Sequence, residues 1–240
     1  MFFSFALTHV LPAAHPSDAA RTTVGPKKAA LAAVASGGLA GLSTILANYG
    51  PVVFAIALLV LWAAGSFALV AIAFSGIGLR VFRRRAGELS LRSLVLLFPY
   101  LAPSWLFHAW RRTQTGPSTE IAPNVFLGGY PWGKGPWHAV LDMTSEYPSP
   151  SAPAGAAYLN IPCVDGVAVP SEALKAGSDF IEQQWRSGPV LIHCAIGRYR
   201  SARAVAQWLQ DYQGLSERDA WRLLRDKRPL VRPPKHLLLL

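Results

Sequence analysis

The sequence has 240 residues, of which 52% are hydrophobic and 15% charged, and its formal net charge is +10. These proportions exclude an ordinary soluble domain over the whole length, because such domains carry about 25% charged residues, and they indicate membrane segments. Residues 1–112 carry ten lysines and arginines against Asp18 and Glu88, whereas residues 113–240 carry thirteen against eleven acidic residues. A basic, apolar first half favours anionic lipid headgroups as partners, and we find no nucleic-acid-binding motif.

Residues 1–28 form an N-terminal segment that begins with an apolar stretch, Met1 to Ala14. The stretch lacks the basic residues that open a secretory signal peptide. Pro12 and Pro16 follow at once and disfavour regular structure. We therefore expect this segment to be mobile or to lie at a membrane surface.

Residues 29–112 are predicted to be a membrane region. Spans of about 29–48 and 52–76 are uncharged and long enough to cross the hydrocarbon core, and a turn at 48–51 joins them. A buried helix of a soluble domain is the alternative for the second segment. Basic residues flank both outer ends, which predicts a multi-pass membrane protein with both ends of this pair on the cytoplasmic side. These flanking residues are Arg21, Lys27, Lys28, Arg80, Arg83, Arg84, Arg85 and Arg92.

Residues 93–110 are apolar and rich in aromatic side chains, but Pro99 and Pro103 lie among them. The segment is either a third span, which would place the following domain outside, or an interfacial segment. We favour an interfacial segment whose helix is broken at the prolines, because each proline removes a helical hydrogen bond and Arg111 and Arg112 follow directly. The domain at 113–240 is then expected to be cytoplasmic.

From residue 113 the pattern changes to short apolar runs separated by glycine and proline. A strand that runs into a loop is expected at 158–166 and a strand at 190–193, and helices are expected at 170–185, 200–212 and 216–227. The predicted fold class is α/β, with a small, mostly parallel central sheet flanked by helices and preceded by transmembrane helices. Tyr130, Trp132 and Trp137 lie in an aromatic loop that is expected either to pack in the core or to form a wall of a substrate site.

The most informative stretch follows the strand Val190 to His193. Cys194 stands where that strand ends, and Arg200 and Ser201 open the next helix. Backbone N–H groups at the start of a helix lower a thiol pKa and bind an anion, and a guanidinium can hold two oxygens of the same anion. The pattern indicates a nucleophile inside a phosphate-binding loop. The remaining loop residues, Ala195, Ile196, Gly197, Arg198 and Tyr199, would contribute backbone N–H groups to bind the substrate.

His193-Cys194-x5-Arg200-Ser201 resembles the signature of the cysteine-dependent protein tyrosine phosphatase superfamily, in its dual-specificity branch. The resemblance implies that Cys194 attacks phosphorus, that Arg200 holds the phosphoryl oxygens and that Ser201 hydrogen-bonds the sulfur. It also implies that His193 tunes the thiolate from behind the loop. No cofactor and no metal site is implied. The alternative is a buried structural cysteine with a solvated Arg200. Residues 121–129 resemble the first strand and turn of dual-specificity phosphatases, and residues 138–144 resemble their next strand.

Asp165 lies 29 positions before Cys194, in a loop after a predicted strand. Members of the resembled family carry their general acid at such a position, so the resemblance assigns that role to Asp165. A turn-forming aspartate before Gly166 is the alternative. Cys163 is either a small packed residue or a redox partner that forms a disulfide with oxidised Cys194. Two cysteines alone do not make a disulfide framework.

Two features bear on the substrate. Gly197-Arg198-Tyr199-Arg200-Ser201 resembles the loop of phosphatidylglycerophosphate phosphatases of this superfamily, although Ala195 and Ile196 depart from it. The expected membrane anchor would also place the site near phospholipid. We therefore expect a membrane-anchored phosphatase for an anionic phospholipid headgroup. A membrane-tethered phosphatase for phosphoprotein and an inactive phosphate-binding module are the alternatives.

Overall fold

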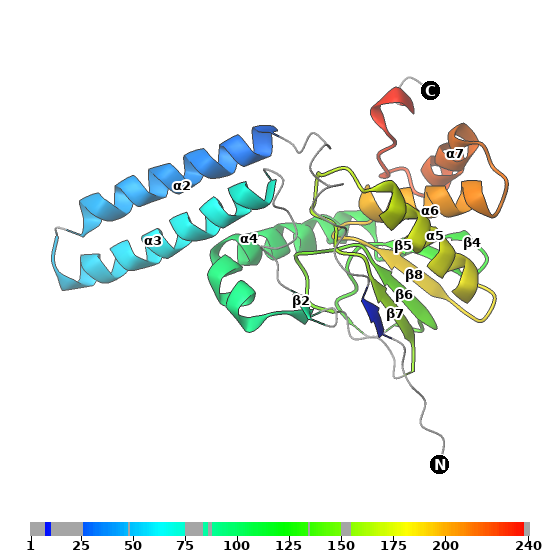
Figure 1. The fold of residues 1–240 in the computed structure, drawn as a ribbon, viewed down its shortest axis with the longest axis horizontal. Helices are drawn as coiled ribbons and strands as arrows, with labels where there is room; N and C mark the ends of the chain where they lie inside the picture. Colours follow the sequence, from blue (N-terminus) through cyan, green and yellow to red (C-terminus); the bar gives the residue numbers. More distant parts are fainter. Residues whose placement is uncertain are drawn as a thin grey trace, which may run out of the picture.

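A computed structural model describes residues 8–10, 26–47, 49–74, 84–85, 88–133, 135–149 and 155–237 (Figure 1). Arg80 and Arg83 of the predicted basic flank and the end of the predicted second span lie outside these residues. The strands are β1 (Thr8–Val10), β2 (Arg84–Arg85), β3 (Glu88–Leu89), β4 (Ser118–Ala122), β5 (Val125–Gly128), β6 (Ala139–Asp142), β7 (Ala157–Asn160) and β8 (Val190–His193). The helices are α2 (Pro26–Leu46), α3 (Pro51–Ile72), α4 (Leu91–Thr115), α5 (Ser171–Gln184), α6 (Arg200–Asp211), α7 (Glu217–Lys227) and the 3-10 turn η3 (Lys235–Leu237).

The central sheet has the strand order β1-β7-β6-β8-β5-β4. Every neighbouring pair is parallel except β4 and β5, which are antiparallel at one edge. All four residues of both β6 and β8 are buried, as expected for central strands covered on both faces. This arrangement confirms the predicted α/β class with a small, mostly parallel sheet.

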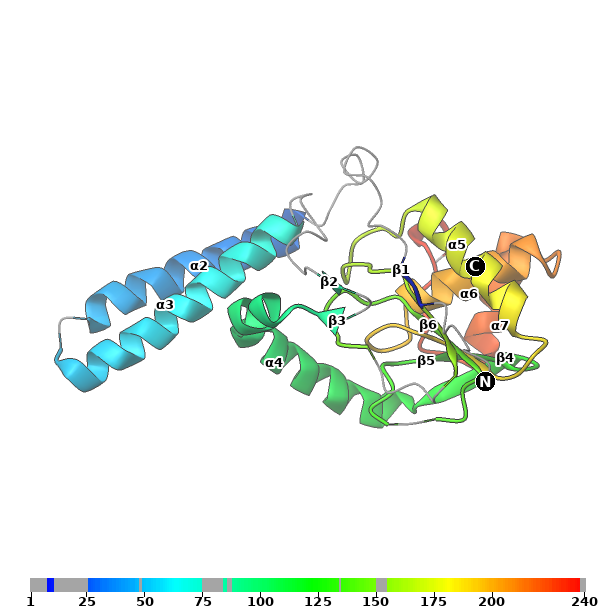
Figure 2. The same ribbon diagram turned by 60° about the horizontal axis from the view of Figure 1, so that its bottom comes forward.

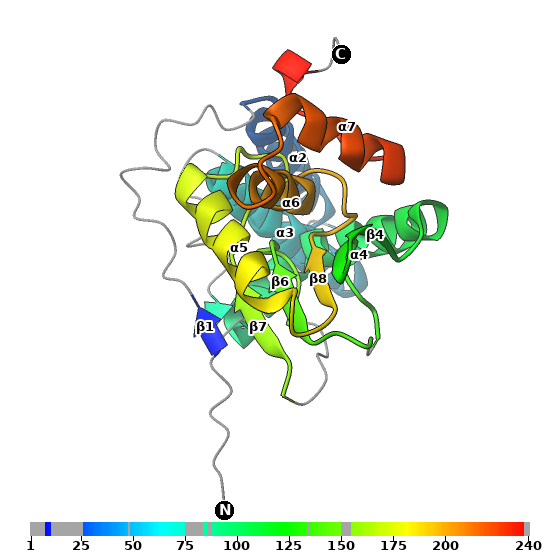
Figure 3. The same cartoon turned by 90° about the vertical axis from the view of Figure 1, so that its right-hand side faces the viewer.

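Helices α5, α6 and α7 lie together on one side of this sheet (Figure 3). Their apolar sides meet the strands in one core that contains Ile181 of α5, Trp208 of α6 and Leu224 of α7. The opposite face of the sheet has a smaller cluster of Val140, Tyr158 and Leu191. Because β8 is central and α6 follows it directly, the loop between them is held by the most buried part of the fold.

The N-terminal segment departs from the prediction at Thr8–Val10. These residues form strand β1, which pairs in parallel with β7 at the sheet edge, with Thr8 opposite Tyr158. The prediction that residues 1–28 form only a mobile or interfacial segment is therefore wrong at this strand. An edge strand has unpaired backbone groups that accept such an addition, and that pairing is not visible in local sequence. Residues 1–7 and 11–25 lie outside the described part of the chain.

Helices α2 and α3 form an extended antiparallel hairpin that projects away from the sheet (Figures 1 and 2). Within the described residues, these two helices are long and apolar enough to cross a membrane. Ser36 Oγ donates to Ala64 O at 2.8 Å, and Ser43 Oγ donates to Ala57 O at 2.7 Å. Small residues and serine bonds of this kind allow close helix contact where lipid surrounds the pair. The outward surfaces carry exposed apolar side chains such as Val34 and Val52.

Helix α4 is continuous from Leu91 to Thr115, although Pro99 and Pro103 lie inside it. The prediction that these prolines break the helix is wrong. Pro99 cannot donate to the carbonyl of Val95, and the indole Nε1 of Trp62 in α3 donates to that carbonyl instead, at 3.1 Å. The helix also extends three residues beyond the expected boundary at residue 112. Helix α4 therefore leads from the hairpin directly to β4.

Candidate active site

The loop between β8 and α6 is the centre of the site, because β8 ends at His193 and α6 begins at Arg200. Gly197 has a φ of 73°, a left-handed conformation that side chains rarely adopt. A Cβ atom at this position would lie 2.4 Å from the carbonyl carbon and oxygen of Gly128. Only glycine fits both the conformation and the space, so Gly197 lets the loop pass close to the end of β5.

Cys194 lies inside this loop and is nearly buried, with 4% of its surface exposed. Its Sγ accepts hydrogen bonds from the backbone N–H of Gly197 at 3.3 Å and from Ser201 Oγ at 3.2 Å. Burial raises the pKa of the Cys194 thiol, but the charge of Arg200, the Ser201 hydroxyl and the backbone N–H groups of Ser201 and Arg198 outweigh it and hold the pKa below its ordinary value. The arrangement therefore stabilises a thiolate.

Arg200 is fully buried at the start of α6. Its Nη1 donates to the carbonyl of Cys163 at 2.7 Å and to Glu146 Oε2 at 2.9 Å, and its Nη2 donates to Glu146 Oε1 at 2.6 Å. Burial lowers the pKa of Arg200, but the carboxylates of Glu146 and Asp165 raise it well above its ordinary value. The guanidinium is thus held charged and in one orientation beside the loop.

Glu146 was not among the sequence-predicted residues. It follows β6 in the turn Thr144–Tyr147, and no motif or spacing in the sequence distinguishes it from a surface glutamate. The structure buries it to 5% exposure against Arg200. Only the pairing of two positions that are 54 residues apart identifies it.

Asp165 is a second carboxylate near the guanidinium of Arg200. Its Oδ1 is 3.4 Å from Arg200 Nη2, and 48% of its side chain is exposed. The structure therefore brings together the four residues that were predicted to be catalytic, which are Cys194, Arg200, Ser201 and Asp165. A partly exposed carboxylate beside a buried cation can exchange protons with solvent and with a bound ligand.

His193 is fully buried behind the loop. Its Nε2 is 3.7 Å from Asp142 Oδ1. The ring of Tyr130 packs edge-on against the imidazole, and the two ring centroids are 5.7 Å apart. Asp142 also accepts hydrogen bonds from the backbone N–H and the hydroxyl of Thr144. His193 and Asp142 thus connect the ends of the neighbouring strands β8 and β6.

The other loop residues contact different parts of the fold. Ala195 packs with Tyr130 and Tyr147, whose stacked ring centroids are 4.3 Å apart. The carbonyls of Ile196 and Gly197 both accept hydrogen bonds from the guanidinium of Arg228, which stands at the end of α7. Arg228 is a second residue that the sequence did not indicate. Tyr199 is the residue immediately before α6, and its ring lies 5.1 Å from the guanidinium carbon of Arg203.

Arg198 connects the nucleophile loop to the C-terminal segment. Its Nε donates to the carbonyl of Leu230 at 2.9 Å, and its own carbonyl accepts from the N–H of Arg232. Partial burial and the nearby charges of Arg232 and Arg111 lower the pKa of Arg198. Arg198 of the loop therefore experiences the positive charges of Arg111 in α4 and Arg232 in the C-terminal segment.

Cys163 is buried and its thiol is not in a disulfide. Burial raises the pKa of this thiol to about 12. Its backbone carbonyl has a separate role, because it accepts hydrogen bonds from Arg200 and from Ser145 Oγ. The redox partnership with Cys194 stays a prediction, and the high pKa leaves little thiolate for it near neutral pH.

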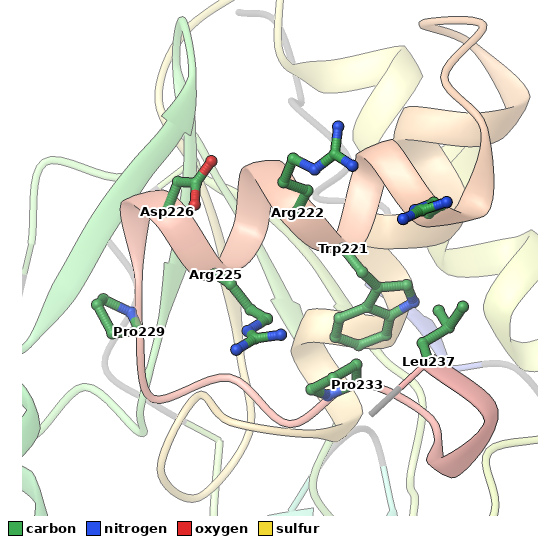
Figure 4. Close-up of a pocket in the computed structure, with 8 residues that line it drawn as sticks. Trp221, Arg222, Arg225, Asp226, Pro229, Pro233 and Leu237 are labelled. Carbon is green, nitrogen blue, oxygen red and sulfur yellow. The ribbon is translucent and has the colours of Figure 1, made fainter. Parts of the chain in front are cut away.

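A cavity of about 450 Å³ lies elsewhere, between α7 and the C-terminal segment (Figure 4). Trp221 and Leu237 form its apolar side, and arginines of α7 line its rim. None of its lining residues belongs to the loop of Cys194 or to that of Asp165. In the described part of the chain, no three His, Cys, Asp or Glu side chains are grouped as ligands for a metal ion.

Comparison with known proteins shows a match to the family described as dual specificity phosphatase, catalytic domain, over residues 136–239. The chain is 29% identical to human dual specificity phosphatase 28 over 129 residues, which are 49% of this chain and 71% of that protein. It is 30% identical to MAP kinase phosphatase with leucine-rich repeats protein 3 of Dictyostelium discoideum, over 50% of this chain and 15% of that protein. Among solved structures, human DUSP28 has 25% sequence identity and a TM-score of 0.43, over 51% of this chain and 88% of that chain.

Proposed function

The chain belongs, through residues 136–239, to the dual-specificity phosphatase family, and we propose on this premise that it hydrolyses phosphate monoesters through a phosphocysteine. The observation that carries the proposal is the environment of Cys194. Its sulfur accepts hydrogen bonds from Gly197 and Ser201 and lies near the charge of a buried arginine. This environment favours the thiolate, which is the nucleophilic form of cysteine.

In the first step, the Cys194 thiolate attacks phosphorus and the bond from phosphorus to the leaving oxygen breaks. The Asp165 carboxyl group donates its proton to that oxygen, so the product leaves as an alcohol. The backbone N–H groups of the loop and the Arg200 guanidinium hold the equatorial phosphoryl oxygens while charge develops on them. The enzyme then carries a phosphocysteine and an ionised Asp165.

In the second step, the Asp165 carboxylate takes a proton from a water molecule that attacks the phosphocysteine. The sulfur–phosphorus bond breaks, inorganic phosphate leaves and Cys194 returns to the thiolate. The hydroxyl of Ser201, 3.2 Å from the sulfur, stabilises that departing thiolate. Protons balance over the cycle, because Asp165 ends it protonated as it began.

We also propose that α2 and α3 anchor this domain in a membrane. Both helices have the required length and composition, and their serine hydroxyls bond within the hairpin. The outer side of α4 adds exposed apolar side chains at Leu106, Phe107 and Trp110, followed by Arg111. This combination suits the interface of an anionic bilayer, with α4 at the surface and the domain on the cytoplasmic side.

The proposed substrate is an anionic phospholipid headgroup such as phosphatidylglycerophosphate. Its support is Arg198 in the nucleophile loop, which is hydrogen-bonded to the backbone of Arg232 and is affected by the charges of Arg232 and Arg111, because several nearby arginines favour a ligand with more than one negative charge. The second candidate substrate is a phosphoprotein, on which the protein-directed members of the family act. The third possibility for function is an inactive phosphate-binding module, and the intact catalytic set weighs against it.

The test uses the full chain in vesicles. Phosphate release is measured from phosphatidylglycerophosphate in the same bilayer and from a phosphotyrosine peptide in solution. We expect higher kcat/KM on the lipid, loss of phosphocysteine in Cys194→Ser, and a fall of roughly 10²–10⁴ in kcat for Asp165→Asn. A higher kcat/KM on the peptide would favour a phosphoprotein phosphatase. Folded protein that turns over neither substrate would favour an inactive binding module.

A further inference from the structure

The loop that carries Asp165 packs on helices that lie outside the family-matched residues. Val164, next to Asp165, is 8% exposed and belongs to one cluster with Val70 and Phe74 at the end of α3 and with Leu97 and Leu101 of α4. We call this group the base cluster. Leu97 and Leu101 are 1% and 0% exposed, so the cluster to which Val164 belongs is shielded from solvent.

The acid itself depends on these neighbours for its position. The loop closes on a hydrogen bond from the N–H of Val167 to the carbonyl of Val164, at 3.3 Å. Val167 also packs against the base cluster, whereas the Asp165 side chain between them is about half exposed. Two apolar anchors therefore hold the loop while the carboxylate points towards Arg200.

Helix α4 brings a second group to the same place. Tyr100 packs at the base cluster, and its pKa is raised to about 12, first by burial and then by the charges of Glu146 and Asp165. The phenol therefore stays neutral near neutral pH. Its packing at the base cluster places this turn of α4 next to the loop that carries Asp165.

The same helix also holds the segment of Glu146. Trp105 Nε1 donates to the carbonyl of Glu146 at 2.9 Å, and His108 Nδ1 is 2.7 Å from the hydroxyl of Tyr147. Successive turns of α4 thereby contact the acid loop and the turn that orients Arg200. Among the described residues of 136–239, only Val164 and Val167 belong to or pack against the base cluster.

We propose that α4 is a positioning helix for the general acid, with Leu97 and Leu101 as the positioning residues that hold the Asp165 loop over the phosphate site. The proposal rests on the proposed function, because it assigns a role in that reaction. It makes a membrane-proximal helix part of the active site's support. Loss of these contacts would then leave the nucleophile loop in place but remove the placement of the acid.

The test compares two soluble substrates with the full chain in phosphatidylcholine vesicles. Para-nitrophenyl phosphate has a good leaving group and needs little proton donation, whereas phenyl phosphate needs more. Leu101→Ala is expected to lower kcat/KM for phenyl phosphate by about tenfold or more and that for para-nitrophenyl phosphate by less than about threefold. Asp165→Asn should show the same selectivity, with a larger loss.

The matched control is Leu96→Ala, the same truncation on the same helix at a side chain that is 51% exposed. It should leave the ratio of the two kcat/KM values unchanged. Thermal unfolding and vanadate inhibition report whether the fold and the nucleophile loop are intact. If Leu101→Ala does not fold, Leu101→Val should fold and show a smaller loss of the same selectivity.

An equal loss on both substrates in the leucine variants, with selective loss in Asp165→Asn, would overturn the positioning role and leave α4 merely structural. An Asp165→Asn variant without selectivity would instead contradict the acid role itself. The two failures are therefore distinguishable in one set of measurements.

Discussion

Arg200 and Glu146 form a paired charged contact in the interior, with Nη2 2.6 Å from Oε1 and Nη1 2.9 Å from Oε2. The contact orients the only fully buried guanidinium among the described arginines, and it does so from a turn 54 residues earlier in the chain. A planar fork held by two parallel bonds cannot rotate without losing both. Glu146 thereby sets the plane in which Arg200 would meet a phosphoryl group.

Glu146→Ala is expected to lower the free energy of unfolding by about 3–5 kcal/mol, because it leaves a buried cation without its main partner. Glu146→Gln keeps the size and part of the hydrogen bonding, so it should fold and report on catalysis through a lower kcat/KM. Chemical denaturation and steady-state kinetics measure the two effects. Glu217→Gln, at an exposed glutamate of α7, should change stability by less than about 0.5 kcal/mol. Equal effects of the two glutamine variants would contradict a special role for Glu146.

Gly197 offers a second prediction with a close control. Gly197→Ala would combine a left-handed φ with a Cβ that meets the backbone of Gly128 at 2.4 Å, so the loop must shift. A displacement of that size is expected to lower kcat/KM by at least about a hundredfold. Gly214→Ala has a similar φ of 67° but open space around it, and it should cost only about 1 kcal/mol of stability with normal turnover. Normal activity in Gly197→Ala would show that the loop tolerates a different path.

The parts of the site that the sequence predicts are those that lie close together in the chain. Strand β8, the loop from Cys194 and the start of α6 follow from one apolar run, one glycine and one helical pattern. Asp165 came from a family resemblance, and the structure places it 3.4 Å from Arg200. These residues are identifiable because their chemistry requires particular types at particular spacings.

The remaining parts depend on contacts between distant segments. Glu146 and Arg228 look like ordinary surface residues in the sequence, and only folding buries them against the nucleophile loop. Strand β1 depends on a free edge of β7, and the continuity of α4 depends on a donor from another helix. Local propensity has no information about such partners, so sequence rules fail at these places.

Ser201 allows the ionisation of Cys194 to be tested directly. Its hydroxyl donates to the sulfur, so Ser201→Ala should raise the pKa of Cys194 and move the rise of iodoacetamide alkylation with pH to higher pH. Below that pKa, loss of one such hydrogen bond of about 1 kcal/mol should slow alkylation about fivefold. Mass spectrometry distinguishes Cys194 from Cys163, whose pKa of about 12 predicts no reaction near neutral pH. An unchanged alkylation profile in Ser201→Ala would mean that the hydroxyl does not stabilise the thiolate.

The carbonyl of Val95 supplies the last prediction, because it explains how α4 stays continuous across Pro99. Trp62→Phe removes the indole donor that replaces the missing N–H of Pro99 at this carbonyl, which should cost about 1 kcal/mol in local stability. Hydrogen exchange of the α4 amides, measured with the full chain in vesicles, should become faster around this turn. Pro99→Ala restores a backbone N–H that can donate to Val95 O, so Trp62→Phe should have less effect in that background. The double-mutant cycle is then expected to give a coupling of about 0.5–1.5 kcal/mol. Additive effects would mean that Trp62 stabilises α4 only through its stacking on Phe98, whose ring centroid lies 6.4 Å from its own.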